Sequence, residues 1–157
     1  MIKTGFIILM AIFFTLFLNT VFYKSRALPF KFSMKELNFE DTTYINIAGK
    51  NIKAEIVDSD EERNKGLGGR KSIGKDEGML FIFPTPANYS FWMKDMRFPI
   101  DIIWIDENKK ISAISENVSP DTYPTSFSSS EPVKYVLEVN AGWVDRNGLK
   151  MGEKVEF

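Results

Sequence analysis

Two absences restrict the residues of this chain that could do chemistry. The sequence contains no cysteine and no histidine. Thiol nucleophiles, disulfides, histidine-ligated zinc and serine–histidine triads are therefore excluded. Any reaction or specific binding must use carboxylates, Lys, Arg, Tyr or hydroxyl groups, and we expect neither a metal nor a cofactor.

Within this limited set, the segment SFWMKDMRFPIDIIWID at 90–106 places several charges in an apolar run. With the period of two of a β-strand, alternate residues from Met96 onward are apolar, and those from Asp95 to Asp101 form a polar face. Beyond Asp101 both faces become apolar. The carboxylate of Asp101 thus stands where a polar group needs a partner.

The N-terminus has a different character. Residues Gly5 to Tyr23 carry no charge and are flanked by Lys3, Lys24 and Arg26. A helix of this length just crosses a bilayer core, so we expect a membrane anchor at 5–23. The alternative is a signal peptide cleaved near Ala27. In either case the domain is expected outside the cytoplasmic membrane, tethered to it or released as a secreted or periplasmic protein.

The rest of the chain is acidic and of ordinary domain size. Three of the 20 basic residues and none of the 21 acidic residues lie in 1–27, so the remainder carries 17 − 21 = −4. This charge, without a basic stripe, argues against a nucleic-acid partner. We expect a linker at 28–42 and one domain at 43–157.

The domain is predicted to be mainly β. Period-two patterns and turn residues predict a hairpin at 42–57, a central strand at GMLFIF (78–83), and further strands at 111–115, 133–139 and the C-terminus. A capping box at Ser59 and Glu62 predicts a short helix, and a second helical turn is expected after 140. The Ser- and Pro-rich segment 115–133 is predicted to be a long mobile loop held by Tyr123 and Phe127. This pattern is typical of a compact antiparallel β-barrel or sandwich with one or two short helices.

Four ordered blocks resemble a known family. They are EERNKGLGGR (61–70), GMLFIF (78–83), FWMKDMRFPIDIIWID (91–106) and YVLEVNAGW (135–143). Together they are similar to the signature of the uncharacterised prokaryotic family catalogued as domain of unknown function 192. The resemblance implies a signal or anchor segment followed by one small, mainly β domain, and it implies no activity. Gly68 stands where members usually have Met, and Asp95-Met96 stand where they have an Asn-Thr-like pair.

Matching these blocks residue by residue identifies five candidate site residues, all polar or amphipathic groups in apolar surroundings: Arg70, Trp92, Lys94, Asp101 and Glu138. Three hypotheses follow. The domain could be a binding module with Trp92 as a platform for a small polar ligand, a sugar or a peptide. It could be a hydrolase such as a glycosidase, with Asp101 and Glu138 as its acid–base pair. It could also be a structural or accessory protein in which these residues form a buried ion-pair network.

For Asp101 the hypothesis is specific. On an ideal strand Lys94 would lie on the opposite face, but Pro99 removes one ladder hydrogen bond and favours a bulge. We therefore expect an irregular strand at Phe98–Pro99, with Asp101 paired to the cation of Lys94 or Arg70.

Overall fold

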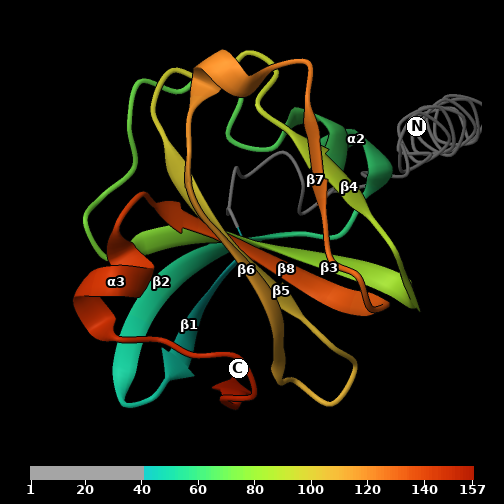
Figure 1. The fold of residues 1–157 in the computed structure, drawn as a ribbon, viewed down its shortest axis with the longest axis vertical. Coiled ribbons are helices and arrows are strands. Elements are labelled where there is room, and N and C mark those ends of the chain that lie inside the picture. Colours follow the sequence, from blue (N-terminus) through green and yellow to red (C-terminus); the bar gives the residue numbers. More distant parts are fainter. Residues whose placement is uncertain (1–40) are drawn as a thin grey trace, which may run out of the picture. The chain divides into compact units, whose positions relative to one another are not determined.

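The domain is built on one seven-stranded sheet and a two-stranded ribbon (Figure 1). The computed structural model describes residues 41–157. The large sheet has the order β6-β5-β8-β3-β2-β1-β9, and β4 pairs with β7 in the ribbon. The strands are β1 (Thr42–Ile47), β2 (Lys50–Val57), β3 (Glu77–Ala87), β4 (Ser90–Trp92), β5 (Ile100–Ile105), β6 (Ile111–Val118), β7 (Ser126–Ser128), β8 (Val133–Asn140) and β9 (Val155–Glu156). The prediction of a mainly β domain is confirmed.

One strand pair departs from the antiparallel pattern that the sequence predicted. β2 and β3 run parallel, from Lys53 opposite Glu77 to Val57 opposite Phe81. A parallel pair needs a crossover connection, and here helix α2 (Asp60–Lys65) lies within it. The predicted capping box starts this helix, with both Ser59–Glu62 contacts present.

The large sheet is curled into a half-barrel, which is neither a closed barrel nor a two-sheet sandwich. β9 pairs with β1, and the turn before β6 meets the C-terminal segment at the bridge between Lys110 and Lys154. The amide N–H of Ile111 donates to the carbonyl oxygen of Glu153 at 2.9 Å. The two edges of the sheet therefore meet at one end only.

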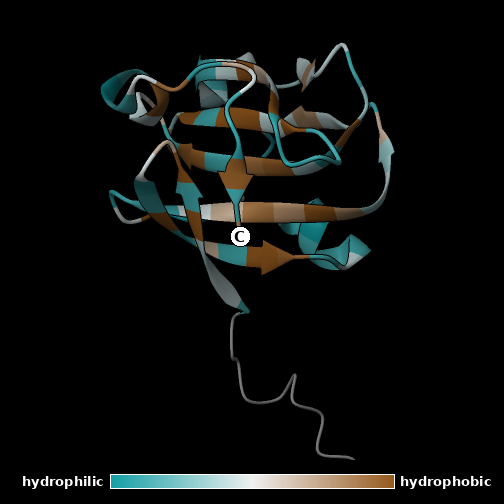
Figure 2. Ribbon diagram, turned by 90° about the horizontal axis from the view of Figure 1, so that it is seen from below, coloured by the Kyte–Doolittle hydropathy of each residue, from teal (hydrophilic) through white to brown (hydrophobic). Residues whose placement is uncertain are grey.

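Each face of the sheet carries its own apolar core. In Figure 2 several strands have brown stretches, which mark their apolar residues. The inner core includes residues of both edge strands, Ile111 of β6 and Val155 of β9, and is covered by α3 (Trp143–Asn147). The outer core includes Met79, Phe81 and Trp104, and the ribbon residues Phe91 and Phe127 pack against it. In Figure 1, α3 lies on the left and α2 lies with the β4–β7 ribbon at the upper right.

The segment 90–106 is two strands rather than one. β4 ends at Trp92 and β5 begins at Ile100, with a turn between them in which Asp95 has a φ of 59°. Lys94 and Arg97 thus belong to a loop. The predicted irregularity at Phe98–Pro99 is confirmed, since both residues lie outside the strands.

The prediction of one long loop at 115–133 is wrong. β6 continues to Val118, a 3-10 turn (η2) spans Pro120–Thr122, and β7 follows. Phe127 lies opposite Phe91 in the ribbon and packs on the outer core. The apolar ring of Phe127 therefore anchors a segment whose serines alone could not bury enough area.

The expected anchor or signal segment at 5–23 lies outside the described residues. Among residues 41–157, no helix is both long enough and apolar enough to span a bilayer.

Candidate functional site

Asp101 is completely buried, with 0% of its surface exposed, and it lies on the inner face of β5. Its carboxylate accepts three backbone hydrogen bonds. The N–H groups of Asn117 and Gly142 donate to Oδ1 at 2.8 and 3.1 Å, and the N–H of Val144 donates to Oδ2 at 2.9 Å. Asp101 thus joins β6 to the N-terminus of α3, where a negative charge is favoured.

The predicted ion pair between Asp101 and Lys94 or Arg70 is therefore wrong. Within residues 41–157, no Lys or Arg side chain lies within ion-pair distance of Asp101. Arg70 instead forms a bidentate ion pair with Glu55 of β2. Backbone N–H groups satisfy the buried charge, as they do at many carboxylates that order a loop.

Glu138 lies on the outer face of the central strand β8, between Met79 of β3 and Ile102 of β5. It is 5% exposed, and its Oε2 atom has no hydrogen-bond partner among the described residues. Burial disfavours the charged form and raises the pKa of Glu138 from 4.5 to about 8. At neutral pH the side chain is therefore mainly an uncharged carboxylic acid, which can both donate and accept a hydrogen bond.

Asp101 and Glu138 do not share a site. In the ladder between β5 and β8, Asp101 lies opposite Val139, and Glu138 lies opposite Ile102. Side chains alternate between faces along a strand, so the two carboxyl groups are on opposite faces of the sheet. A glycosidase pair must flank one bond of one substrate, and this geometry excludes that role for Asp101 and Glu138.

Glu138 lies instead in the lining of a groove of about 1210 Å³ on the outer face of the sheet. Trp92 and Lys94 also line this groove, whereas Arg70 and Asp101 do not. The structure thus brings together three of the five predicted residues. One side of the groove is formed by α2 and the turn after it, and the other side by β4 and the loop after it. Side chains of β3 and β8 also line it. The lining residues are Asp60, Arg63, Asn64, Lys65, Gly66, Leu67, Gly68, Gly69, Phe81, Phe83, Tyr89, Ser90, Phe91, Trp92, Lys94, Asp95, Met96, Arg97, Ser126 and Glu138.

Aromatic rings make up much of the lining. Tyr89 stacks on Phe83, with ring centroids 3.5 Å apart. Trp92 is 54% exposed, and Tyr123 meets it edge to face at 5.9 Å. The Lys94 ammonium lies 5.9 Å from the centroid of the Trp92 ring. An exposed tryptophan beside a cation gives the rim both a stacking surface and a charge.

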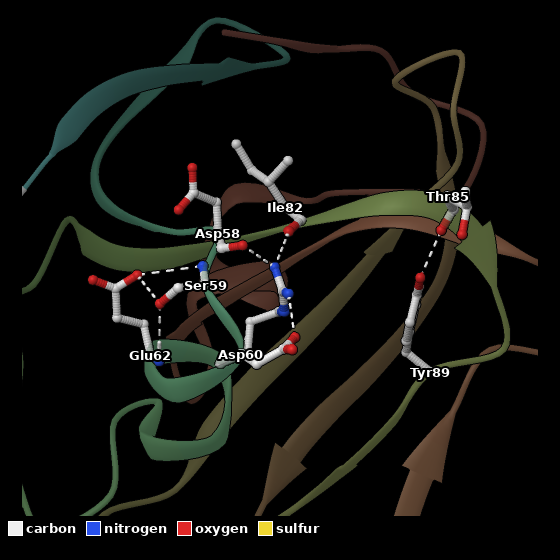
Figure 3. Close-up of polar contacts among 8 residues, drawn as sticks. Asp58, Ser59, Asp60, Glu62, Ile82, Thr85 and Tyr89 are labelled. Atoms are coloured by element: carbon white, nitrogen blue, oxygen red, sulfur yellow. Dashed lines mark hydrogen bonds and ion pairs between the residues drawn. The ribbon is translucent and has the colours of Figure 1, made fainter.

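Hydrogen bonds fix the groove in advance of any ligand. Arg63 of α2 donates to the carbonyl oxygens of Asp58 and, at 2.8 Å, of Ile82, so the helix is attached to β3 (Figure 3). The Tyr89 hydroxyl donates to the carbonyl oxygen of Thr85 at 2.6 Å. The wall formed by α2 and the ring of Tyr89 are therefore positioned by the fold, as is usual for ligand sites.

Most residues of the groove lining were not predicted from the sequence. Arg63, Phe83, Tyr89, Phe91 and Arg97 were not among the candidates. The period of two in GMLFIF does place Phe81 and Phe83 on one face, and this was the available signal. The loop residues carried no comparable pattern.

These features define a class: a small, mainly β domain with a curled half-barrel sheet and an aromatic groove around a buried carboxyl group. The family model DUF192, described as "Uncharacterized ACR", matches residues 43–157. The chain belongs to this family, and the resemblance of its four blocks is confirmed.

Solved structures agree with this assignment. A crystal structure of a proposed transcription regulator from Sinorhizobium meliloti 1021 is similar, with a TM-score of 0.71 and 32% identity over 74% of this chain and 94% of that chain. A protein of unknown function from Novosphingobium aromaticivorans DSM 12444 has a TM-score of 0.71 and 31% identity over 74% of this chain and 85% of its own. A comparison with curated proteins finds no match.

The contacts of Asp101 generate a stability prediction. Asp101→Asn keeps the shape but replaces one oxygen by an NH₂ group that faces backbone donors. We expect a loss of about 2–4 kcal/mol in the free energy of unfolding, measured by urea denaturation. Asp95→Asn is the matched control, because its exposed turn with positive φ suits Asn and should change stability by less than about 0.5 kcal/mol. Equal midpoints for the two variants would contradict the structural role of Asp101.

The raised pKa of Glu138 generates a pH prediction. Between pH 4.5 and about 8 the group is ionised in the unfolded chain and protonated in the folded one. Its contribution to stability is therefore full below pH 4.5 and is lost as pH rises through 8, with a slope of up to about 1.4 kcal/mol per pH unit. Urea midpoints measured from pH 5 to 8 should fall more steeply for the wild type than for Glu138→Gln. Parallel profiles would show that Glu138 titrates normally.

Proposed function

We propose that this domain is a binding module for a small polar ligand, a sugar or a short peptide, held in the groove around Glu138. One observation carries the proposal: the Oε2 atom of Glu138 is buried and lacks a hydrogen-bond partner within the described chain, and Glu138 lines an open groove. A ligand in the groove would offer the carboxyl group of Glu138 a hydrogen-bond partner that the described chain does not provide.

The unsatisfied Oε2 atom of Glu138 carries an energetic cost. An unsatisfied buried polar group costs about 1–3 kcal/mol. Both cross-strand neighbours of Glu138, Met79 and Ile102, are apolar, so an apolar residue at 138 would suit the fold better. Buried Asp101, by comparison, has three donors. A buried polar group that destabilises the fold, and that no contact within the fold compensates, is expected where the side chain serves binding.

The chemistry of the groove agrees with a ligand that has both polar and apolar surface. Glu138, as a neutral acid, can donate to and accept from a hydroxyl or an amide. The rings of Tyr89 and Trp92 offer flat apolar surface. Sugars and short peptides combine these two features, and the volume of about 1210 Å³ leaves room for more than one residue or sugar ring.

A nucleic-acid partner has no support in the charge distribution. The chain beyond residue 27 has a net charge of −4, and the groove cations are gathered around one pocket. A backbone-binding surface needs a longer basic stripe.

We further propose that the domain acts outside the cytoplasmic membrane, tethered through residues 5–23 or released by cleavage near Ala27. The uncharged run from Gly5 to Tyr23 supports this proposal. A reporter enzyme that is active only in the periplasm, fused after Phe157, is expected to be active. Activity confined to a reporter that works only in the cytoplasm would refute this location.

The proposed role of Glu138 predicts a conflict between stability and function. Glu138→Leu removes the unsatisfied group and should raise the free energy of unfolding by about 1–3 kcal/mol at pH 7, measured by urea denaturation. The same variant should lose binding of any ligand found for the wild type. Glu131→Leu, at an exposed position, controls for a general effect of added apolar surface. A destabilised Glu138→Leu would mean that the carboxyl group supports the fold, and the proposal would fail.

A further inference from the structure

We propose that the ligand of this groove carries a carboxylate group, which binds to the cations Lys65, Lys94 and Arg97 while the rest of the ligand extends toward Glu138. This inference rests on the proposed binding function and names the chemical class of the ligand.

The first observation is an excess of positive charge around the groove. Its lining includes the cations Arg63, Lys65, Lys94 and Arg97, but its only acidic residues are Asp60, Asp95 and the uncharged Glu138. The chain beyond residue 27 is acidic as a whole, with a net charge of −4. The groove therefore has the opposite sign to the domain that carries it, and such a local potential attracts anions.

The second observation is that three of these cations are not neutralised by the protein. Arg63 forms an ion pair with Asp60 at 2.6 Å and also binds backbone carbonyl oxygens. For Lys65, Lys94 and Arg97, in contrast, no carboxylate of the described domain lies within 4.0 Å. All three side chains are exposed. Their positive charge is therefore available to a ligand.

The third observation is where these cations lie. Lys65 ends α2 on one side of the groove, and Lys94 and Arg97 lie in the loop on the other side. The ammonium of Lys94 is 5.9 Å from the Trp92 ring. A ligand stacked on Trp92 would thus have its charged group beside Lys94. Asp95, the acidic residue of the same loop, disfavours a ligand with more than one negative charge at this place.

The polar groups of the groove complete the argument. An ionised carboxylate at the base would repel an anionic ligand, but Glu138 is uncharged at neutral pH and can donate a proton in a hydrogen bond. Among sugars and peptides, a uronic acid and a peptide C-terminus each supply such a carboxylate. Both sources present the same chemistry to the groove.

Matched probe pairs test this inference by NMR titration of the ¹⁵N-labelled domain. One pair is galacturonic acid and galactose, and the other is N-acetyl-dialanine and its C-terminal amide. We expect one acid to bind at least about tenfold more tightly than its neutral counterpart at low salt, with shifts at the Trp92 indole N–H and at Gly66–Gly69. The pair that shows this difference identifies the source of the carboxylate.

Variants separate the groove cations from general charge effects. Lys94→Ala and Arg97→Ala should each weaken binding of the acid about threefold or more, whereas Lys150→Ala, an exposed position outside the groove, should leave it unchanged. Equal or tighter binding of the neutral members would overturn the carboxylate inference and leave the binding function intact. The absence of groove shifts with all four probes would also overturn the carboxylate inference. The binding function is tested separately, by the free energy of unfolding of Glu138→Leu.

Discussion

The central constraint on this fold is a sheet that is buried on both faces. All six residues of β5 are buried, and β8 contributes Leu137 to one core and Val136 to the other. A sheet of this kind needs a cover on each side. α3 and the curl of the edge strands cover the inner face, and the β4–β7 ribbon covers part of the outer face. The ribbon and α2 do not meet over the whole outer face, and the opening between them is the groove.

The two buried carboxyl groups show how the same residue chemistry serves different ends in one sheet. Asp101 is surrounded by backbone donors, so its charge is stabilised and it fixes α3 against β5 and β6. Glu138 has only apolar cross-strand neighbours, so its charge is suppressed by desolvation. The number of available N–H groups separates a structural acid from a candidate binding acid. Burial alone would have placed the two residues in the same category.

Features with a local origin could be predicted from the sequence. The capping box at Ser59 and Glu62, the hairpin of β1 and β2, and the central position of Phe81 all follow from short-range patterns. The partners of Asp101 could not be predicted, because they are backbone N–H groups, which nearly every residue has. The side chains of Asn117 and Val144 give no indication that their N–H groups bind a carboxylate. The loop at Lys94 was missed for a related reason: the left-handed conformation of Asp95 breaks a strand that alternation alone would continue. The groove depends on these long-range arrangements, so only Trp92, Lys94 and Glu138 were anticipated in it.

The pairing of β9 with β1 has a consequence for how the chain acquires its structure. The first strand of the domain is completed by the last, through the contacts of Asn46 with Glu156 and of Ile47 with Val155. During synthesis this edge of β1 cannot pair at Asn46 and Ile47 until β9 has left the ribosome. Contacts between such distant residues slow folding and prolong the exposure of apolar surface. A chain truncated before Val155 would keep this edge open permanently, and an open strand edge is a template for association with other chains.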